Sequence, residues 1–177
     1  LELRPLLPSD EFAYRNFFYS LQEKTIYMRF FYKMRTFTHE VAQKQWASLD
    51  YRHNISIVGL VQKGGHKEIL AIGSYARESE ERAEVAFVVR EDFQGQGIGS
   101  YLLELLETIA IQNGYKGFCA TVLRENASML RVFKNRYPNA KVTFSGGSEV
   151  LVDMQFDDAS PRALNSQNGQ KFAPPPR

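Results

Sequence analysis

Cysteine and histidine are scarce in this chain, and their scarcity excludes several kinds of site. The single cysteine among 177 residues, Cys119, leaves no disulfide possible within the chain. The three histidines have no partner at a spacing typical of metal ligands. The sequence therefore predicts no metal centre, and it fits a reducing compartment such as the cytoplasm.

Long apolar runs and an excess of either charge are also missing. No run approaches the roughly 20 residues needed to span a bilayer, and the first residues, LELRPLL, lack the basic, apolar and small-residue order of a signal peptide. Lys and Arg total 22 against 20 Asp and Glu, which gives a net charge of +2. Charge alone therefore predicts no nucleic-acid partner, and no feature predicts a membrane partner.

Apolar residues are plentiful and predict one folded domain followed by a tail. They make up 44% of the chain, with 13 Phe and 9 Tyr, which is enough to bury a core. After residue 156 the composition shifts to Asp, Ser, Asn, Gln and Pro. We expect a domain over residues 1–156 and a disordered tail over 157–177. Because the chain begins at Leu1 rather than Met, membership of a longer multidomain chain is a further expectation.

Hydrophobic periodicity predicts strands and helices in an order that fits an α+β domain. The expected strands cover residues 1–7, 55–61, 68–77, 83–90, 116–123, 141–145 and 149–156. The expected helices cover residues 10–21, a segment that Thr38 caps, 98–113 and 127–137. The aromatic and basic segment 25–37 has a poor helical period, which favours a loop with some helical turns. The order predicts a mixed, mostly antiparallel sheet of about seven strands with helices on both faces.

A glycine-rich segment, QGQGIG at residues 94–99, joins the expected strand 83–90 to the helix that follows. Ser100 stands where a dinucleotide fingerprint needs its third glycine, and no Gly-Lys-Ser/Thr follows to make a Walker A loop. Two interpretations remain. The free N–H groups of a helix start favour an anion such as a pyrophosphate, and glycines allow its close approach. Alternatively, the glycines only form a turn between a strand and a helix.

The segment Gln94-x-x-Gly97-x-Gly99 resembles motif A, Q/R-x-x-G-x-G/A, of the GNAT superfamily of acyl-CoA-dependent N-acyltransferases. ENASML at residues 125–130 resembles the asparagine-led helix beside the CoA arm in that family, and the order of elements matches over residues 1–156. The resemblance implies acetyl-CoA, the acylated form of coenzyme A, as the donor. It places donor-binding residues at Val88, Val89, Gln94, Gly95, Gln96, Gly97, Ile98, Gly99, Ser100 and Asn126.

The resemblance also implies what these residues do. The N–H groups from Gln94 to Gly99 would hold the pyrophosphate, the backbone of Val88 and Val89 would pair with the pantetheine arm, and Asn126 would contact that arm. The strands before and after the glycine helix would splay apart, with the thioester in the gap. Arg131 and Lys134 are candidates for the 3′-phosphate, although solvated surface charge is the favoured interpretation of both.

Glu84 is the candidate general base. It lies in AEVAFVV among apolar neighbours, where a carboxylate is costly unless it is solvated, paired or functional. Partial burial would raise its pKa toward the range that suits a base. The alternative is a glutamate at the edge of a sheet that pairs with Arg82 or another cation.

The chain further resembles a GNAT subgroup, the bacterial protein lysine acetyltransferases that modify acyl-CoA synthetases, which place a catalytic glutamate at this position. Ser20-Leu21 and YMRFF at residues 27–31 resemble the S-L-(x)n-Y-x-R-F-F pattern of that subgroup, and a packed aromatic loop is the alternative interpretation. Phe133 replaces a tyrosine that protonates the CoA thiolate in many GNAT members. Ser128 and Cys119 are the nearest substitutes in sequence, and the subgroup also tends to lack the tyrosine.

These features together predict an acetyltransferase that moves the acetyl group of acetyl-CoA to a protein lysine by direct attack. Two alternatives stay open: the same chemistry on a small amine such as a polyamine, and a non-catalytic acyl-CoA-binding sensor. The acidic turn before the Glu84 strand, with Glu78, Glu80 and Glu81, is either solvated surface or a lip that attracts a cationic substrate.

Overall fold

The computed structural model describes residues 1–31, 36–144 and 146–158, so the tail expected over 157–177 lies almost wholly outside the described residues. A seven-stranded sheet has the order β1-β2-β3-β4-β5-β7-β6. All neighbouring strands are antiparallel except β4 and β5, which confirms the predicted α+β class. The strands are β1 (Glu2–Pro5), β2 (Asn54–Lys63), β3 (His66–Arg77), β4 (Arg82–Val89), β5 (Gly117–Leu123), β6 (Lys141–Phe144) and β7 (Glu149–Gln155).

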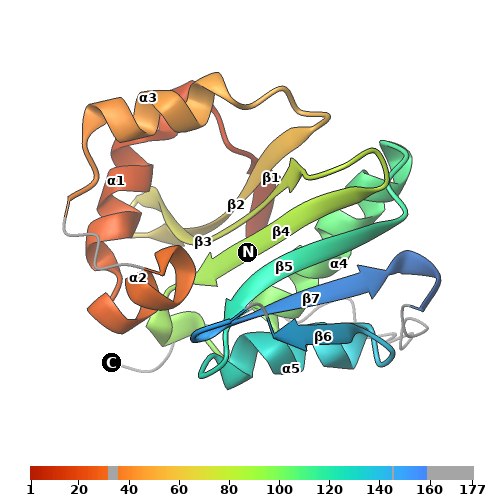
Figure 1. Cartoon of the computed structure of the whole chain (residues 1–177). Helices are drawn as coiled ribbons and strands as arrows, with labels where there is room; N and C mark the ends of the chain where they lie inside the picture. The colour runs from red at the N-terminus through yellow and green to blue at the C-terminus, as the bar shows by residue number, and fades with distance from the viewer. Residues whose placement is uncertain (32–35, 145, 159–177) are drawn as a thin grey trace, which may run out of the picture.

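Helices cover both faces of the sheet, and each face has its own apolar core (Figure 1). On one face, residues of α1 and α2 pack with Val58, Leu60 and Ile72 of the sheet. On the other face, α4 and α5 pack on alternate residues of the same strands, such as Ile55 and Ile57. The helices are α1 (Glu11–Ser20), α2 (Glu23–Phe30), α3 (His39–Ala47), α4 (Ile98–Gln112) and α5 (Ala127–Arg136). No helix among the described residues has the length and apolar character of a membrane span.

Helix α2 replaces part of the loop expected over residues 25–37. It ends at Phe30 and is followed by the C-cap residue Phe31, which adopts a left-handed conformation with φ of 65°. The sequence shows no helical period here because α2 is short and buries only Ile26, while other side chains of the helix face a cavity. Residues 32–35 lie outside the described part of the chain.

The pairing of β4 with β5 stops after three residue pairs, the last of which is Glu84 with Cys119. Beyond that point β4 continues beside β3 as far as Val89, while β5 continues beside β7 as far as Leu123. The two parallel strands therefore part at Glu84. One edge of β4 is left without a strand partner over residues 85–89, and this opening is the splay that the resemblance to the GNAT superfamily implied.

Candidate active site

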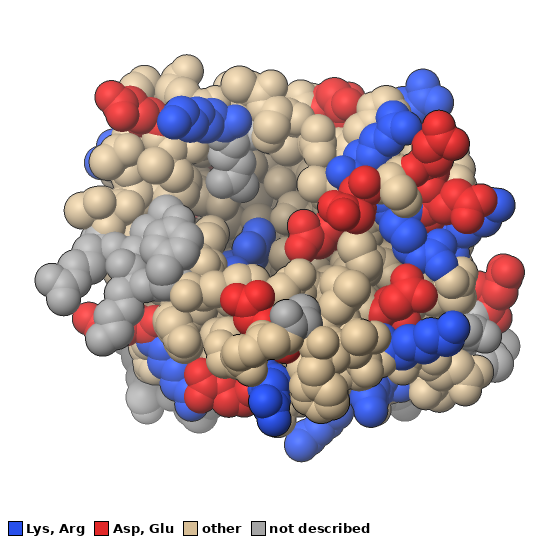
Figure 2. Space-filling view, viewed as in Figure 1, with Lys and Arg blue, Asp and Glu red and all other residues tan. Residues whose placement is uncertain are grey.

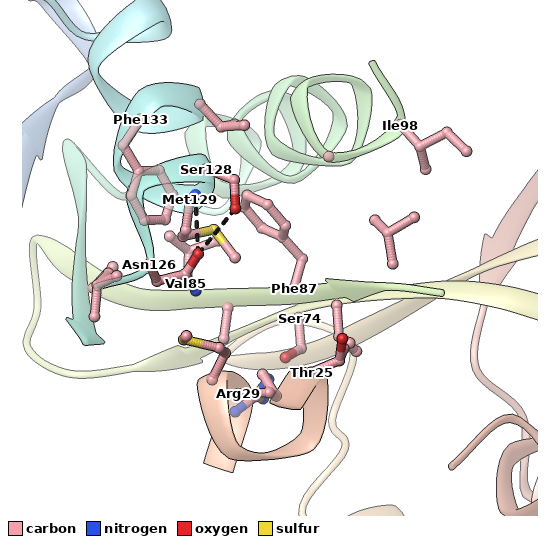
Figure 3. Close-up of a pocket in the computed structure, with 18 of the residues that line it drawn as sticks. Thr25, Arg29, Ser74, Val85, Phe87, Ile98, Asn126, Ser128, Met129 and Phe133 are labelled. Carbon is pink, nitrogen blue, oxygen red and sulfur yellow. Dashed lines mark hydrogen bonds between the residues drawn. The ribbon is translucent and has the colours of Figure 1, made fainter. Parts of the chain in front are cut away.

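A cavity of about 880 Å³ opens where β4 and β5 part. One side, here called the glycine-loop wall, consists of residues 94–100 and the start of α5. The other side, the α2 wall, consists of Thr25, Met28 and Arg29 together with Glu84. Figure 3 shows Asn126, Ser128, Met129 and Phe133 on one side of β4, and Thr25 and Arg29 on the other. In Figure 2 the molecule is hollowed beside the α1–α3 face, with a basic side chain inside the hollow and acidic ones at its rim.

The glycine-loop wall offers backbone N–H groups that no described residue accepts a hydrogen bond from. Gly95 and Gly97 have φ of 74° and 81°, and a Cβ at either position would meet open space. Within the described residues, no acceptor takes the N–H groups from Gly95 to Ser100, and the first in-helix bond runs from Tyr101 N to Gly97 O. The first turn of α4 contains no acidic residue. This arrangement suits a pyrophosphate at the positive end of the α4 dipole.

Gly99, the third glycine of the loop, is required for packing rather than for backbone conformation. A Cβ on Gly99 would lie 3.1 Å from the ring of Phe87 on β4, so Gly99 allows α4 to pack closely on the sheet. Phe87 in turn packs edge-to-face on Phe133 of α5, with ring centroids 5.6 Å apart. Phe133 is fully buried at the base of the cavity.

The structure brings the predicted donor-binding residues together, since all of them except Gln96 line the cavity. Gln96 instead donates a side-chain hydrogen bond to Asp92 O at 3.2 Å. Arg90 N donates to Leu70 O of β3, and backbone direction alternates along a strand. The backbone groups of Val88 therefore face β3, whereas those of Val89 face the open edge.

The start of α5 presents polar groups to the same cavity. Asn126 caps the helix, and its Oδ1 accepts hydrogen bonds from Met129 N at 3.2 Å and from the Ser128 hydroxyl at 3.1 Å. Arg131 also lines the cavity and is exposed, whereas Lys134 is exposed and does not line it. Of the two candidate phosphate cations, only Arg131 lies beside the glycine-loop wall.

Glu84 lies on the α2 wall at the point where the strands part. The expected partial burial is wrong, because Glu84 is exposed, having no neighbouring β5 residue beyond Cys119 to cover it. The expected alternative, a pair with Arg82, is also wrong, since Arg82 binds Asp153 at 2.9 Å. Within the described residues, the Glu84 carboxylate accepts one hydrogen bond, a long one of 3.5 Å from the Thr121 hydroxyl. The carboxylate is therefore available to an incoming group.

Arg29 is a functional candidate that sequence reasoning placed only within an aromatic, basic motif. It is partly buried on α2 and lines the same cavity as Glu84. Burial lowers the pKa of Arg29, and the negative charge of Glu84 opposes that shift. The neighbouring Phe30 packs on Phe18, so one motif supplies both a core contact and a cavity residue.

Cys119, named above as a possible substitute for the missing tyrosine, is partly buried on β5. Burial, and then the charge of Glu84, raises the pKa of its thiol to about 11. In the acidic turn before β4, Glu81 already pairs with Lys116, and this pair lowers the pKa of Glu81. Glu81 is therefore less available to attract a cationic substrate.

A hydrogen bond joins the segment just before the glycine loop to the start of α2, and so links the elements that carry the two walls. The carboxylate of Glu91, which lies just before the glycine loop, accepts from Gln22 N at 2.8 Å. Gln22 is the N-cap residue of α2, so Glu91 satisfies a free N–H group at the start of the helix that carries Arg29. No local sequence pattern predicts this contact, since the two residues are far apart in the chain.

Comparison with known proteins identifies the family that this site belongs to. The sequence model of the "Acetyltransferase (GNAT) family" matches residues 21–136, which include both walls of the cavity. The chain belongs to the GNAT acetyltransferase family. The chain is similar to Acetyltransferase Pat of Mycolicibacterium smegmatis, with 32% identity over 136 residues, a match that covers 73% of this chain and 38% of Pat. Acetyltransferase PA5475 of Pseudomonas aeruginosa is 27% identical over 128 residues, covering 72% of this chain and 68% of that protein.

Solved structures agree with this GNAT fold. The GNAT domain of S. lividans PAT superposes with a TM-score of 0.75 at 24% identity, covering 86% of this chain and 89% of that domain. A cAMP-binding acyltransferase from Mycobacterium smegmatis superposes with a TM-score of 0.58 at 26% identity, covering 91% of this chain and 46% of that protein. This GNAT chain therefore spans less than half the length of some relatives that it matches.

Proposed function

We propose that this GNAT domain transfers the acetyl group of acetyl-CoA to the ε-amine of a protein lysine, with Glu84 as general base. The observation that carries the proposal is the position of Glu84. Its carboxylate is exposed at the point where β4 and β5 part, next to the open edge of β4 and across the cavity from the glycine loop. The similarity to Acetyltransferase Pat supports the choice of a protein acceptor.

The glycine-loop wall fits acetyl-CoA as the donor substrate. The free N–H groups from Gly95 to Ser100 would bind the pyrophosphate, and the open β4 edge at Val89 would pair with the pantetheine arm as an added strand would. Such pairing would direct the thioester toward the splay, where Glu84 lies. Gln94 now donates a side-chain hydrogen bond to Val89 O at 2.8 Å, so the arm would share or replace that bond.

The reaction then needs two proton transfers from the acceptor nitrogen and one bond exchange. Glu84 takes the first proton, which leaves the nitrogen lone pair free to attack the thioester carbonyl. A C–N bond forms, the C–S bond breaks, and its electron pair leaves on sulfur. The nitrogen also loses its second proton, which ends on the thiolate, so that the products are the amide and the CoA thiol. Phe133 has no proton to donate, so we propose that the start of α5, which has no acidic residue in its first turn, stabilises the departing thiolate.

The proposal is tested by measuring thiol release from acetyl-CoA with three acceptors: an acyl-CoA synthetase protein, free lysine and spermidine. We expect fast release with the protein, and acetylation of one or a few of its lysines by mass spectrometry. Faster release with spermidine or free lysine would assign the domain to small amines. Binding of acetyl-CoA without release for any amine would favour a sensor. We further propose the cytoplasm as the setting, since a reducing compartment keeps Cys119 a free thiol.

A further inference from the structure

Arg29 holds a positive charge that no described side chain pairs by a hydrogen bond or an ion pair, although the charge of Glu84 acts on it through space. It is partly buried and lines the cavity, and no described residue forms a hydrogen bond or an ion pair with its guanidinium. The guanidinium lies over the Phe30 ring, 5.0 Å from its centroid, which compensates it only partly. Arginine stays protonated in proteins, and an unpaired charge that is partly removed from water costs stability. A role for the charge itself would explain why the site keeps it.

The surroundings of Arg29 direct that charge toward Glu84. Helix α2 packs against both β4 and β5 at the splay. The groups that raise the pKa of Arg29 against the effect of burial are Tyr14 from α1 and Glu84 from β4. Cys119 of β5 is the register partner of Glu84, and its thiol lies 3.8 Å from Ala83 O. The other charged side chains that line the cavity are Lys24, Glu91, Glu125 and Arg131.

We infer that Arg29 promotes deprotonation of the acceptor amine through its positive charge, without a bond to the acceptor. An amine that approaches Glu84 arrives mostly as an ammonium ion at neutral pH. A nearby cation disfavours the ammonium form relative to the neutral amine. The N–H bond breaks with its electron pair retained by nitrogen, and the proton passes to the Glu84 carboxylate. The inference rests on the proposed role of Glu84 as base.

The charge of Arg29 is tested by comparing Arg29→Met, which removes it, with Arg29→Lys, which keeps it. The measurement is kcat against pH at saturating acetyl-CoA, with Nα-acetyl-lysine methylamide as the acceptor. For Arg29→Met we expect the part of the profile where kcat rises with pH to shift to higher pH by about one unit. At high pH its kcat should approach the wild-type value. Arg29→Lys should keep the wild-type profile. An equal loss of kcat at every pH, or a rise in acceptor KM alone, would overturn the inference, the latter indicating a contact with an anionic group of the acceptor.

A second pair of variants separates the amine from the base. Since removing Arg29 also changes the field at Glu84, the same profile is measured for Glu84→Gln and for Glu84→Gln combined with Arg29→Met. If Arg29→Met shifts the pH profile in the Glu84→Gln background as well, Arg29 acts on the amine. If the shift disappears in that background, Arg29 acts only through Glu84. If Glu84→Gln itself retains full turnover, the proposed function of Glu84 fails, which is a different result.

A stability measurement gives a readout that does not depend on turnover. Because Arg29→Met removes a partly buried charge that lacks an ion-paired partner and keeps much of the side-chain volume, its Tm should be a few degrees above that of the wild type. Arg29→Lys should not share this gain. A Tm of Arg29→Met below the wild-type value would show that the guanidinium is a structural contact, which contradicts the inference.

Discussion

The two walls of the cavity are built from different parts of the protein chain. The glycine-loop wall offers main-chain N–H groups from one continuous segment, and glycines keep the space above them open. The α2 wall offers side chains, Glu84 and Arg29, from elements that lie far apart in the sequence. A backbone site recognises a phosphate group whatever the rest of the ligand is, whereas charged side chains act on one reacting atom. Substitutions on the glycine-loop wall should therefore change mainly the binding of acetyl-CoA, and substitutions on the α2 wall should change mainly the rate of the chemical step.

The largest effect is expected for Glu84→Gln on the α2 wall. The amide keeps the size of the side chain but cannot accept the proton, so kcat should fall by about 10²- to 10⁴-fold while the Kd for acetyl-CoA stays unchanged. Stopped assays of thiol release and calorimetric titration measure the two quantities. Glu80→Gln, in the exposed turn before β4, is the matched control and should change neither. Full turnover in Glu84→Gln would show that Glu84 is not the base, and the α2 wall would then have no assigned role in the chemical step.

The next largest effect is expected for Gly97→Ala on the glycine-loop wall, with Gly65→Ala as its control. Both glycines have positive φ, 81° and 88°, and a Cβ would meet open space at both. Each substitution should therefore cost about 1–2 kcal/mol of stability. Only Gly97→Ala should also weaken acetyl-CoA binding, by about tenfold, since its Cβ occupies the space next to the N–H groups. Equal Kd values for the two variants would mean that the loop does not bind the pyrophosphate.

A smaller effect is expected for Glu91→Ala, which removes the hydrogen bond that links the elements carrying the two walls. Loss of the bond to Gln22 N should loosen the start of α2 at a cost of about 1 kcal/mol, raising the acceptor KM about fivefold. The Kd for acetyl-CoA should change little, because the N–H groups of the loop are untouched. Glu91→Gln, whose side-chain oxygen can still accept, should recover most of the loss. A larger effect on the donor Kd than on the acceptor KM would assign Glu91 to the glycine-loop wall.

The smallest effect is expected for Gly99→Ala, which distinguishes the two kinds of glycine within one wall. Its Cβ would press on the Phe87 ring, so unfolding free energy should fall by about 1 kcal/mol while the Kd for acetyl-CoA stays close to wild type. Adding Phe87→Leu should reduce the cost of Gly99→Ala, which a double-mutant cycle of denaturation measures. Additive losses would indicate that the ring can move aside.

The sequence predicted the elements whose signals are local. The turn at residues 63–66 forms with Gly64 and Gly65 at positive φ, Thr38 and Asn126 cap their helices, and Gly114 follows α4 with φ of 92°. These features depend on a few consecutive residues, so a pattern in the chain is enough to predict them. Helix α2 was missed because it buries only one residue, which leaves no helical period to detect.

By itself the sequence determined the fold class, the glycine loop and the presence of a carboxylate on the strand before that loop, because secondary-structure periods and backbone conformation are local properties. Only the tertiary structure decided that Glu84 is exposed rather than partly buried, that Arg82 binds Asp153 instead of Glu84, and that Arg29 enters the same cavity. Exposure and pairing depend on where β5 turns away from β4 and on where α2 packs. Those positions result from contacts between distant segments, which no local pattern records.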